Sequence, residues 1–479
     1  MNHKFVFYTI GNIIKIEAVL MALPLLVSLI YRDGNYIAFL IPIILAFAIG
    51  IFLTIKKSKT ERIYAKEGLV IVGLSWIIIS FFGALPFVIS GEIPNIINAL
   101  FETVSGFTTT GASIITDVES VSRSLLFWRN LTHWIGGMGI LVFILAILPQ
   151  TNSRSIYVMR AEVPGPQVDK ITTKVRYTAR ILYGIYVGLT IMQIILLAFK
   201  LPIYDSMINA FATAGTGGFS ALSASIGGYN SLYVEIVIMI FMFLFGVNFL
   251  LFYMILLGKI KSVFKNEELR WYFGIVIIGI VLLTINTLPT YGSLFETIRY
   301  TSFQVVSIIT TTGFATHDFN TWPDFSKAIL VVLMFIGASA GSTGGGIKVS
   351  RIILYFKKIF RGIRYAIQPR KISTIRLDRK PVNEMILEGL STYLITYIAI
   401  FIIGILIISM EGLDLVSSFS AVAATINNVG PGLNIVGPVG NYSSLTDLSK
   451  ITLMFMMLVG RLEIFPILIL FSPSTWKRK

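Results

Sequence analysis

An eleven-residue stretch of this chain occurs twice. Residues 101–111 and 303–313 share Phe, an acidic or amide residue, Val, Ser and a closing Thr-Thr-Thr-Gly, with no gap between them. Self-similarity of this kind indicates internal repeats, which constrain the architecture more than any local pattern does. A glycine after three hydroxyl side chains also suits a backbone that leaves a helix and turns its carbonyl groups toward a ligand. We therefore predict that this stretch lines an ion pore.

The composition of the chain is that of a membrane protein. Of the 479 residues, 55% are hydrophobic and 13% are charged, and the mean hydropathy is +0.81, which is far more apolar than soluble domains are. The first apolar run is interpreted as a retained helix rather than a cleaved signal peptide. The absence of cysteine excludes disulfide frameworks and zinc–thiolate sites. Because a helix needs about 20 apolar residues to cross a membrane, ten spans are predicted, at residues 10–31, 36–55, 68–90, 124–149, 179–199, 233–258, 271–289, 326–347, 385–410 and 445–471.

Four shorter apolar segments are interpreted as re-entrant. They lie between predicted spans three and four, five and six, seven and eight, and nine and ten, and they end in Gly with Thr or Asn. Cytoplasmic loops collect Lys and Arg, and 30 of the 39 basic residues fall on one face if each short segment returns to the side it came from. The net charge of +15 therefore indicates orientation, with docking of an acidic partner or anionic lipid as a secondary role. A nucleic-acid partner is not expected.

The predicted fold is an all-α integral membrane protein with two N-terminal helices and four helix–pore loop–helix repeats around a central pore. The predicted boundaries are residues 1–66 for the leading helices and 67–178, 179–269, 270–384 and 385–479 for the repeats. The second and fourth copies are degenerate and keep a glycine with a small or polar approach to it. The turn glycines are predicted to be Gly111, Gly217, Gly313 and Gly430.

The four loops are predicted to form a K+ selectivity filter. Irregular backbone at membrane depth is tolerated only where protein buries it or water wets it, so the loops should converge on one wet axis. Carbonyl oxygens contributed four at a time can replace the hydration shell of K+, and each short helix would direct its negative C-terminus toward the ion. A plain helix cap could explain one copy, but four matched copies favour a filter. The predicted filter residues are Thr109, Thr110, Gly111, Gly215, Thr216, Gly217, Thr311, Thr312, Gly313, Asn428, Val429 and Gly430.

Glycines recur in the second helix of each copy. Small residues in membrane helices usually indicate close packing, which is the simpler interpretation of the first copy, Gly-Gly-Met-Gly at residues 136–139. The third copy has five glycines over residues 337–346, each costing about 1 kcal/mol relative to alanine in a helix. We predict a broken helix with a flexible loop below the filter that is able to obstruct it. A phosphate-binding loop is excluded, because Ile347 separates the last glycine from Lys348. The predicted gate residues are Gly341, Gly344, Gly345, Gly346 and Arg461.

Arg461 would lie in the middle of the last predicted span, where a charge costs about 2.5–3.5 kcal/mol on insertion scales. It is predicted to face the pore and to set the barrier for cations. The alternative is a structural pair with Glu463 or with a pore-helix carboxylate. Glu102 and Gln304, at matched positions of the repeats, are expected to brace the pore helices or to set the polarity of the outer mouth. His133 and Trp134 are interpreted as packing residues.

These motifs resemble those of the Trk/Ktr/HKT potassium-transporter superfamily, and in particular its TrkH-like membrane subunits. The resemblance covers nearly the whole chain and rests on the four loops, Gly-Gly-Met-Gly after the first, Gly-Ser-Thr-Gly-Gly-Gly-Ile-Lys after the third and Gly-Arg-Leu-Glu after the fourth. It implies a homodimer with one pore per protomer, docked on a cytoplasmic nucleotide-binding ring of the TrkA type. It also implies that residues 344–346 belong to an intramembrane gate beside Arg461. In plant relatives, serine at the first filter glycine accompanies Na+ permeation, so an intact Gly111 implies K+.

The predicted function is potassium uptake across the bacterial cytoplasmic (inner) membrane, through a K+-selective pore gated by the loop and by a cytoplasmic regulatory subunit. The alternative is a proton- or sodium-coupled K+ symporter, although the predicted spans lack a chain of Asp, Glu and His that could relay protons. An enzyme is not expected, because the spans contain no metal-ligand spacing and no nucleophile–base set. K+ is the transported ion, no organic cofactor is expected on this chain, and membrane lipid is a further partner.

Overall fold

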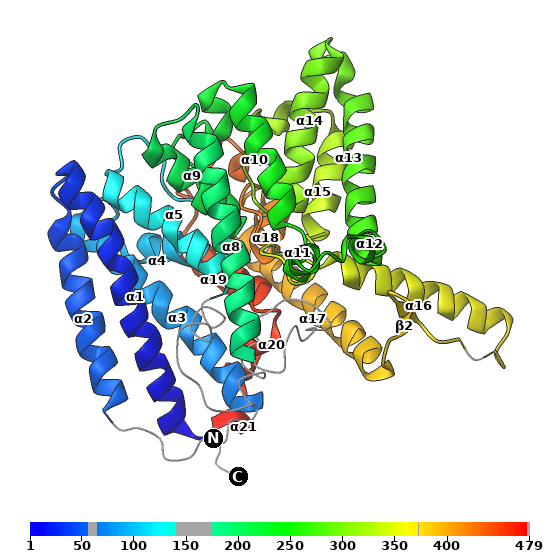
Figure 1. The fold of residues 1–479 in the computed structure, drawn as a ribbon, viewed down its shortest axis with the longest axis horizontal. Helices are drawn as coiled ribbons and strands as arrows, with labels where there is room; N and C mark the ends of the chain where they lie inside the picture. The colour runs from blue at the N-terminus through cyan, green and yellow to red at the C-terminus, as the bar shows by residue number, and fades with distance from the viewer. Residues whose placement is uncertain (56–64, 140–174, 372, 477–479) are drawn as a thin grey trace.

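The computed structural model describes residues 1–55, 65–139, 175–371 and 373–476, and these residues form an almost entirely helical membrane protein (Figure 1). Within this described part, six helices are long and apolar enough to cross a membrane. The α1 and α2 helices pack along each other and against α3 at one side of the molecule, and α13 stands at the other side. These helices match six of the ten predicted spans. They are α1 (His3–Tyr31), α2 (Tyr36–Thr54), α3 (Ala65–Ser90), α8 (Val175–Ala198), α13 (Glu267–Tyr291) and α17 (Glu384–Ser409).

Four shorter helices occupy the predicted re-entrant segments. With 12 to 16 residues each, they are too short to cross a membrane. The first and last of them begin at side-chain caps: Asn95 Oδ1 accepts a hydrogen bond from Ile97 N at 2.8 Å, and Asp414 Oδ2 accepts one from Ser417 N at 3.0 Å. The last four residues of each helix are buried, so these helices end inside the protein. They are α4 (Ile96–Phe107), α9 (Ile203–Gly215), α14 (Leu294–Ile309) and α18 (Leu415–Ile426).

The second helix of each repeat is interrupted, so the continuous spans predicted at residues 124–149, 233–258 and 445–471 were wrong. The α5 helix (Arg123–Gly137) ends at its glycine pair, and residues 140–149 lie outside the described residues. The α10 helix (Leu232–Phe245) meets α11 (Phe249–Leu256) at a bend of 93°. The α19 helix (Asp447–Arg461) is followed by left-handed Glu463 and Ile464 before α20 (Phe465–Leu468) begins. The break predicted in the third copy is confirmed, because residues 336–348 separate α15 (Asp324–Phe335) from α16 (Val349–Ile367).

Two of these interruptions follow directly after the point where the second helix meets its own pore helix. A Cβ atom added at Gly136 would collide with the carbonyl group of Phe107, and one added at Gly460 would collide with that of Ile426. Phe107 and Ile426 are the last residues of α4 and α18. The close packing expected of the first copy is therefore confirmed, and the fourth copy repeats it.

Short elements complete the described part of the chain. A two-residue antiparallel hairpin, in which Arg376 pairs with Pro381, joins α16 to α17, and α16 projects from the body of the molecule (Figure 1). The long helices present apolar side chains outward, as lipid-facing surfaces require; Ile44 and Phe52 of α2 are examples. The short elements are α12 (Ile260–Phe264), α21 (Pro473–Trp476), η2 (Ser225–Tyr229), η3 (Phe319–Thr321), η4 (Asn434–Val436), η5 (Ile469–Phe471), β1 (Arg376–Leu377) and β2 (Lys380–Pro381).

Candidate ion-conducting site

The loops that follow the four pore helices share one backbone conformation. Each has a left-handed residue and, two positions later, a glycine with positive φ. Non-glycine residues rarely adopt positive φ, so four matched occurrences indicate that the loops fold alike. The left-handed residues, with φ between 53° and 58°, are Thr109, Thr216, Thr311 and Asn428. The glycines, with φ between 79° and 98°, are Gly111, Gly218, Gly313 and Gly430.

The hydrogen bonds of the loops set the register of the second copy. In every loop, the residue before the glycine donates its N–H to the carbonyl oxygen five residues earlier, at 2.8–2.9 Å; the pairs are Thr110–Ser105, Gly217–Ala212, Thr312–Ser307 and Val429–Ala424. Gly217 therefore matches Thr110, and Gly218 is the turn glycine. The predicted register of the second loop was wrong by one residue, because sequence alone does not show which of two adjacent glycines takes the positive φ. Gly215, predicted to be in the filter, is the last residue of α9.

The loops close into a ring in chain order. A Cβ atom added to Gly111 would lie within 3.0 Å of the Gly217 carbonyl oxygen. The same holds for Gly218 against Thr312, Gly313 against Val429, and Gly430 against Thr110. Each glycine thus abuts the next loop, and the fourth loop returns to the first. No side chain fits at any of these four positions, because Cβ atoms do not approach other atoms so closely.

The ring presents buried carbonyl groups that lack a donor. In the described part of the chain, no N–H or O–H group donates to the carbonyl oxygens of the four residues that precede the ring glycines, although all four residues are buried. Buried carbonyl groups are almost always paired in folded proteins, so a set of four calls for a ligand. Backbone oxygens are the ligands that a dehydrated K+ ion uses. The four residues are Thr110, Gly217, Thr312 and Val429.

Several polar side chains of the loops are, by contrast, hydrogen-bonded to protein, whereas Thr109 Oγ1 is buried and has no partner among the described residues. The hydroxyl oxygens of Thr108 and Thr110 lie 2.7 Å apart, and those of Thr310 and Thr312 lie 2.8 Å apart. Asn428 Nδ2 donates to Thr110 Oγ1 at 3.0 Å, which ties the fourth loop to the first. These hydrogen bonds hold the first and third loops in shape and tie the fourth loop to the first.

A cavity of about 140 Å³ opens onto the ring. It is formed by residues that follow the ring in each loop and by the connections to the second helices. Within the described residues, no group of three or more His, Asp or Glu side chains could hold a metal ion. The unpaired carbonyl oxygens of the ring are candidate ligands for a cation. Ring and adjacent residues that line the cavity are Gly111, Gly218, Phe219, Gly313, Ala315 and Pro431.

Glu102 and Arg129 form a buried ion pair beside the first two loops, and Arg129 also lines the cavity that opens onto the ring. Glu102 of α4 lies 2.6 Å from Arg129 Nε of α5, and the two side chains are 0% and 3% exposed. Glu102 also accepts a hydrogen bond from Ile114 N at 3.0 Å. The Arg129 guanidinium lies 3.5 Å from the ring centroid of Phe219, in the second loop, and Nη1 donates to Ser220 O at 3.3 Å. The expectation that Glu102 braces its pore helix is confirmed.

His133 contacts the first pore helix, α4, and the second loop. Its Nε2 accepts a hydrogen bond from Phe219 N at 3.3 Å, so Nδ1 carries the proton and donates to Gly106 O at 2.7 Å. A Cβ atom at Gly217 would collide with the imidazole ring. The interpretation of His133 as a packing residue missed this link between the first pore helix and the second loop, as the predictions missed Arg129. The available signal was a pair of polar side chains inside an apolar span, which is rare without a structural or functional reason.

The glycine-rich loop at residues 336–348 contacts the third and fourth pore loops. Gly345 N donates to Thr311 Oγ1 at 2.6 Å. A Cβ atom added at Gly345 would lie 2.5 Å from Asn427 O, and one at Gly344 would lie 3.0 Å from Thr310 O. These contacts confirm that the glycine-rich loop lies against the third and fourth pore loops, whereas the assignment of those loops to a filter and the role of the glycine-rich loop as a gate stay predictions.

Two buried cations hold the same loop. Lys348 Nζ donates to the carbonyl oxygens of Gly344 and Gly345, a contact that the sequence analysis did not anticipate. Arg461, at the end of α19, donates to Thr343 O at 2.7 Å and to Gly136 O at 2.5 Å. Arg461 therefore joins the loop to the end of α5 in the first repeat. Its neighbour Glu463, which the sequence analysis considered as a partner for Arg461, forms an ion pair with Arg351 at 2.5 Å.

Glu268 fastens both ends of the glycine-rich loop. Its Oε1 atom accepts hydrogen bonds from Ala340 N at 2.7 Å and from Ser350 N at 3.0 Å. Glu268 lies in the first turn of α13 and is 7% exposed. One carboxylate thus connects the start of the loop, the start of α16 and the spanning helix of the same repeat.

Glu268→Ala is expected to loosen this loop and to raise basal cation flux. The substitution leaves two buried N–H groups without an acceptor, at about 1–3 kcal/mol each, so the melting temperature should also fall. Glu268→Gln keeps an acceptor oxygen and should stay close to the parent protein. Glu388→Ala, an exposed carboxylate of α17, is the control. If the basal cation flux and the melting temperature of Glu268→Ala equal those of the control, Glu268 does not hold the glycine-rich loop in place.

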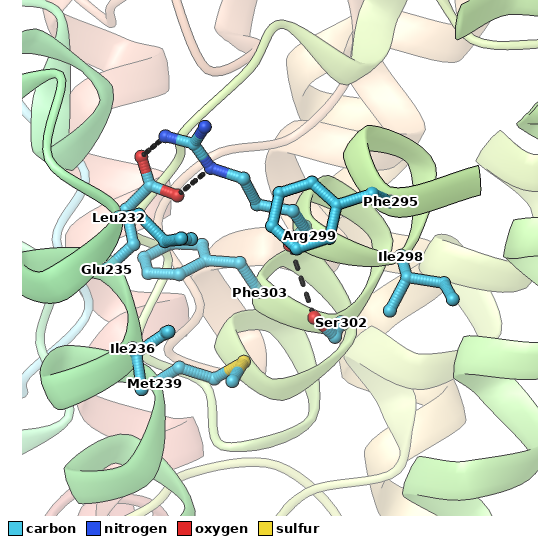
Figure 2. A pocket seen from close by; sticks show the side chains of 9 residues that line it. All are labelled: Leu232, Glu235, Ile236, Met239, Phe295, Ile298, Arg299, Ser302 and Phe303. Carbon is cyan, nitrogen blue, oxygen red and sulfur yellow. Dashed lines mark hydrogen bonds and ion pairs between the residues drawn. The ribbon is translucent and has the colours of Figure 1, made fainter. Parts of the chain in front are cut away.

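A bidentate ion pair ties the third pore helix to the second repeat. Figure 2 shows Arg299 of α14 facing Glu235 of α10, with Nε–Oε2 and Nη2–Oε1 distances of 2.7 and 2.6 Å. The pair lies at one end of an apolar pocket of about 230 Å³ between the two helices. Apolar side chains from both helices line this pocket: Leu232, Ile236, Met239, Phe295, Ile298 and Phe303.

Arg299→Gln is expected to lower the melting temperature of the purified protein. The substitution leaves Glu235, which is 5% exposed, without its partner. Breaking a buried ion pair costs about 3–5 kcal/mol of stability. Because Arg299 is partly exposed, we expect a cost at or below the lower end of this range. The double variant Glu235→Gln/Arg299→Gln should recover most of the loss. Lys327→Gln removes a pair whose carboxylate, Asp324, is 98% exposed, and should change little. Equal melting temperatures of Arg299→Gln and Lys327→Gln would contradict a stabilising role for the Arg299–Glu235 ion pair.

Four short buried helices whose loops meet in a ring, together with six helices long and apolar enough to cross a membrane in the described residues, define a multi-pass membrane protein. A profile of the TrkH family, described as cation transport protein, matches residues 36–478. The chain belongs to this family, which is a family of transporters and not of enzymes.

Relatives of known identity cover the whole chain. It is 38% identical to the Trk system potassium uptake protein TrkH of Salmonella typhimurium, with 100% of both chains covered. It is 32% identical to the Trk system potassium uptake protein TrkG of Escherichia coli, with 99% of both covered. The crystal structure of the potassium transporter TrkH from Vibrio parahaemolyticus superposes with a TM-score of 0.90 at 31% identity and covers 100% of both chains.

Proposed function

We propose that this protein takes up potassium ions across the bacterial cytoplasmic membrane through a K+-selective pore. The observation that carries the proposal is the ring of four buried carbonyl groups without a donor in the described part of the chain. Oxygens arranged in this way can replace the hydration shell of K+, and four pore helices end at the ring with their negative C-termini. The names of the relatives, potassium uptake proteins and a potassium transporter, support the choice of ion.

The proposed filter combines the predicted residues with the corrected second loop. The four repeats are proposed to span residues 67–178, 179–269, 270–384 and 385–479, each contributing one quarter of the filter. In the second repeat, Gly218 takes the place predicted for Gly217. The proposed filter residues are Thr109, Thr110, Gly111, Thr216, Gly217, Gly218, Thr311, Thr312, Gly313, Asn428, Val429 and Gly430.

The glycine-rich loop with Arg461 is the proposed gate. Its contacts with Thr311 and with the fourth loop support a closed state in which it obstructs the inner end of the filter. Lys348 and Arg461 add positive charge there, which raises the barrier for a cation. The relatives are named as parts of a Trk system, which supports further components; we propose a homodimer docked on a cytoplasmic nucleotide-binding ring of the TrkA type.

Ion flux in proteoliposomes tests this function. With K+ on one side and Na+ on the other, the reversal potential should follow the K+ gradient, and a proton ionophore should not change the flux once voltage is clamped. A reversal potential that does not change with the K+ gradient would contradict the proposal that K+ is the transported ion. Uphill K+ movement driven by a pH or Na+ gradient would establish the coupled symporter instead.

A further inference from the structure

Helix α16 leaves the body of the protein with a largely exposed apolar face. Figure 1 shows it running crosswise to the spanning helix α13 and away from the bundle, next to the β1–β2 hairpin. Large apolar side chains recur along one side of α16 at the spacing of a helical face, and each is 49–72% exposed. Exposed apolar faces of this extent mark contact with a membrane or a partner. The residues are Phe356, Ile359, Phe360, Ile363 and Ile367.

Basic side chains occupy the rest of the helix and its C-terminal end. Lys357 forms an ion pair with Glu267 and Arg361 forms one with Glu384, both at 2.5 Å. Three more, Arg364, Arg370 and Lys371, are exposed and form no ion pair with any residue that the structure describes. Most of the positive charge at this end of α16 is therefore available to a ligand.

Basic residues of α16 and of the segment that follows it line a cavity of about 540 Å³. The volume accommodates a phosphate-bearing headgroup, and the guanidinium groups provide the paired donors that bind phosphate oxygens well. Among the lining residues, five are basic and one is acidic, so the cavity favours an anion. The charged lining residues are Lys358, Arg361, Arg364, Arg370, Lys371 and Glu384.

We propose that this cavity binds the headgroup of an anionic phospholipid of the cytoplasmic leaflet, while the apolar face of α16 lies among the acyl chains. The basic loops place α16 on the cytoplasmic side, where anionic lipids attract clusters of Lys and Arg. A helix with a basic flank and an apolar face lies in the plane of the membrane interface. Because α16 begins directly after Lys348, a lipid bound here also restrains one end of the loop at residues 336–348.

Native mass spectrometry of the full-length protein, titrated with phosphatidylglycerol, tests the headgroup site. The variant Arg364→Gln/Arg370→Gln/Lys371→Gln should bind this lipid at least fivefold more weakly. The variant Lys259→Gln/Lys261→Gln/Lys265→Gln removes the same charge from exposed residues of another basic loop and should bind like the parent. An equal loss of phosphatidylglycerol affinity in both variants would contradict the proposed site. Binding of phosphatidylcholine with the same affinity as phosphatidylglycerol would also contradict it. Displacement by millimolar inorganic phosphate would assign it to a free anion instead.

Spin labelling tests the apolar face independently. The chain contains no cysteine, so Phe360→Cys provides a single labelling position. In vesicles that contain phosphatidylglycerol, the label should be relaxed by oxygen and protected from a water-soluble nickel complex, and a label at Lys357→Cys, on the basic flank, should show the opposite preference. Access of the nickel complex to both positions would overturn insertion into lipid. Spin–spin broadening between labels at position 360 would show that a second copy covers this face.

Discussion

Gly111→Ser is expected to admit Na+ and to lower the K+/Na+ permeability ratio. Gly111 has a φ of +80°, and a Cβ atom there would collide with the Gly217 carbonyl group, so serine has to displace one of the four ring carbonyls. Losing one carbonyl ligand to a cation costs about 1.5 kcal/mol or more, by analogy with a hydrogen bond to a charged group, which is roughly tenfold in permeability. The reversal potential in a planar bilayer with K+ and Na+ on opposite sides measures the ratio.

The control for this prediction is Gly184→Ser. Gly184 lies in α8, and a Cβ atom there meets no other atom within 4 Å, so the same chemical change is made at an open position. This variant should keep the permeability ratio of the parent. An unchanged ratio in Gly111→Ser would count strongly against the assignment of the four loops to the filter, because the ring leaves no room for a side chain at this position.

Deletion of residues 344–346 is expected to raise basal K+ flux about tenfold or more. The deletion removes the hydrogen bond from Gly345 N to Thr311 Oγ1 and the carbonyl groups that Lys348 contacts. Each such bond stabilises the closed arrangement by about 1 kcal/mol, and about 1.4 kcal/mol shifts a two-state equilibrium tenfold. Initial rates of K+ uptake into proteoliposomes, without any regulatory subunit, measure the effect.

Selectivity serves as the internal control for the deletion. The ring glycines and their hydrogen bonds lie outside the deleted residues, so the K+/Na+ permeability ratio should stay at the value of the parent. A variant that elutes as a monodisperse species with unchanged flux would show that the loop is not the barrier. Increased flux with lost selectivity would instead indicate that the deletion damages the filter.

Several elements could be predicted because their signals are local. Long apolar runs predict the six spanning helices, since the length needed to cross a membrane is a property of the segment itself. The identical Thr-Thr-Thr-Gly endings of the first and third loops predict their matched turns at Gly111 and Gly313. The break after α15 is predictable as well, because five glycines within ten residues cannot hold a helix.

Other elements depend on packing that a single sequence does not reveal. The sequence around Val247 is apolar on both sides, so hydropathy indicates one span where α10 and α11 meet at 93°. Adjacent Gly217 and Gly218 left the register of the second loop ambiguous until the hydrogen bond to Ala212 O resolved it. The contacts of Arg129 and Glu268 join segments far apart in the chain, and neither residue belongs to a recurring motif.

The ring at the centre of this protein is drawn from one polypeptide, although its four quarters are alike in backbone. In a channel of four identical subunits, every change in the filter is made four times at once. Here the position before the ring glycine is Thr in two loops, Gly in one and Val in another, while the backbone φ angles remain matched. If the ring is the proposed filter, a single codon change alters one quarter of the coordination shell, and ion preference can be tuned in small steps by point mutation.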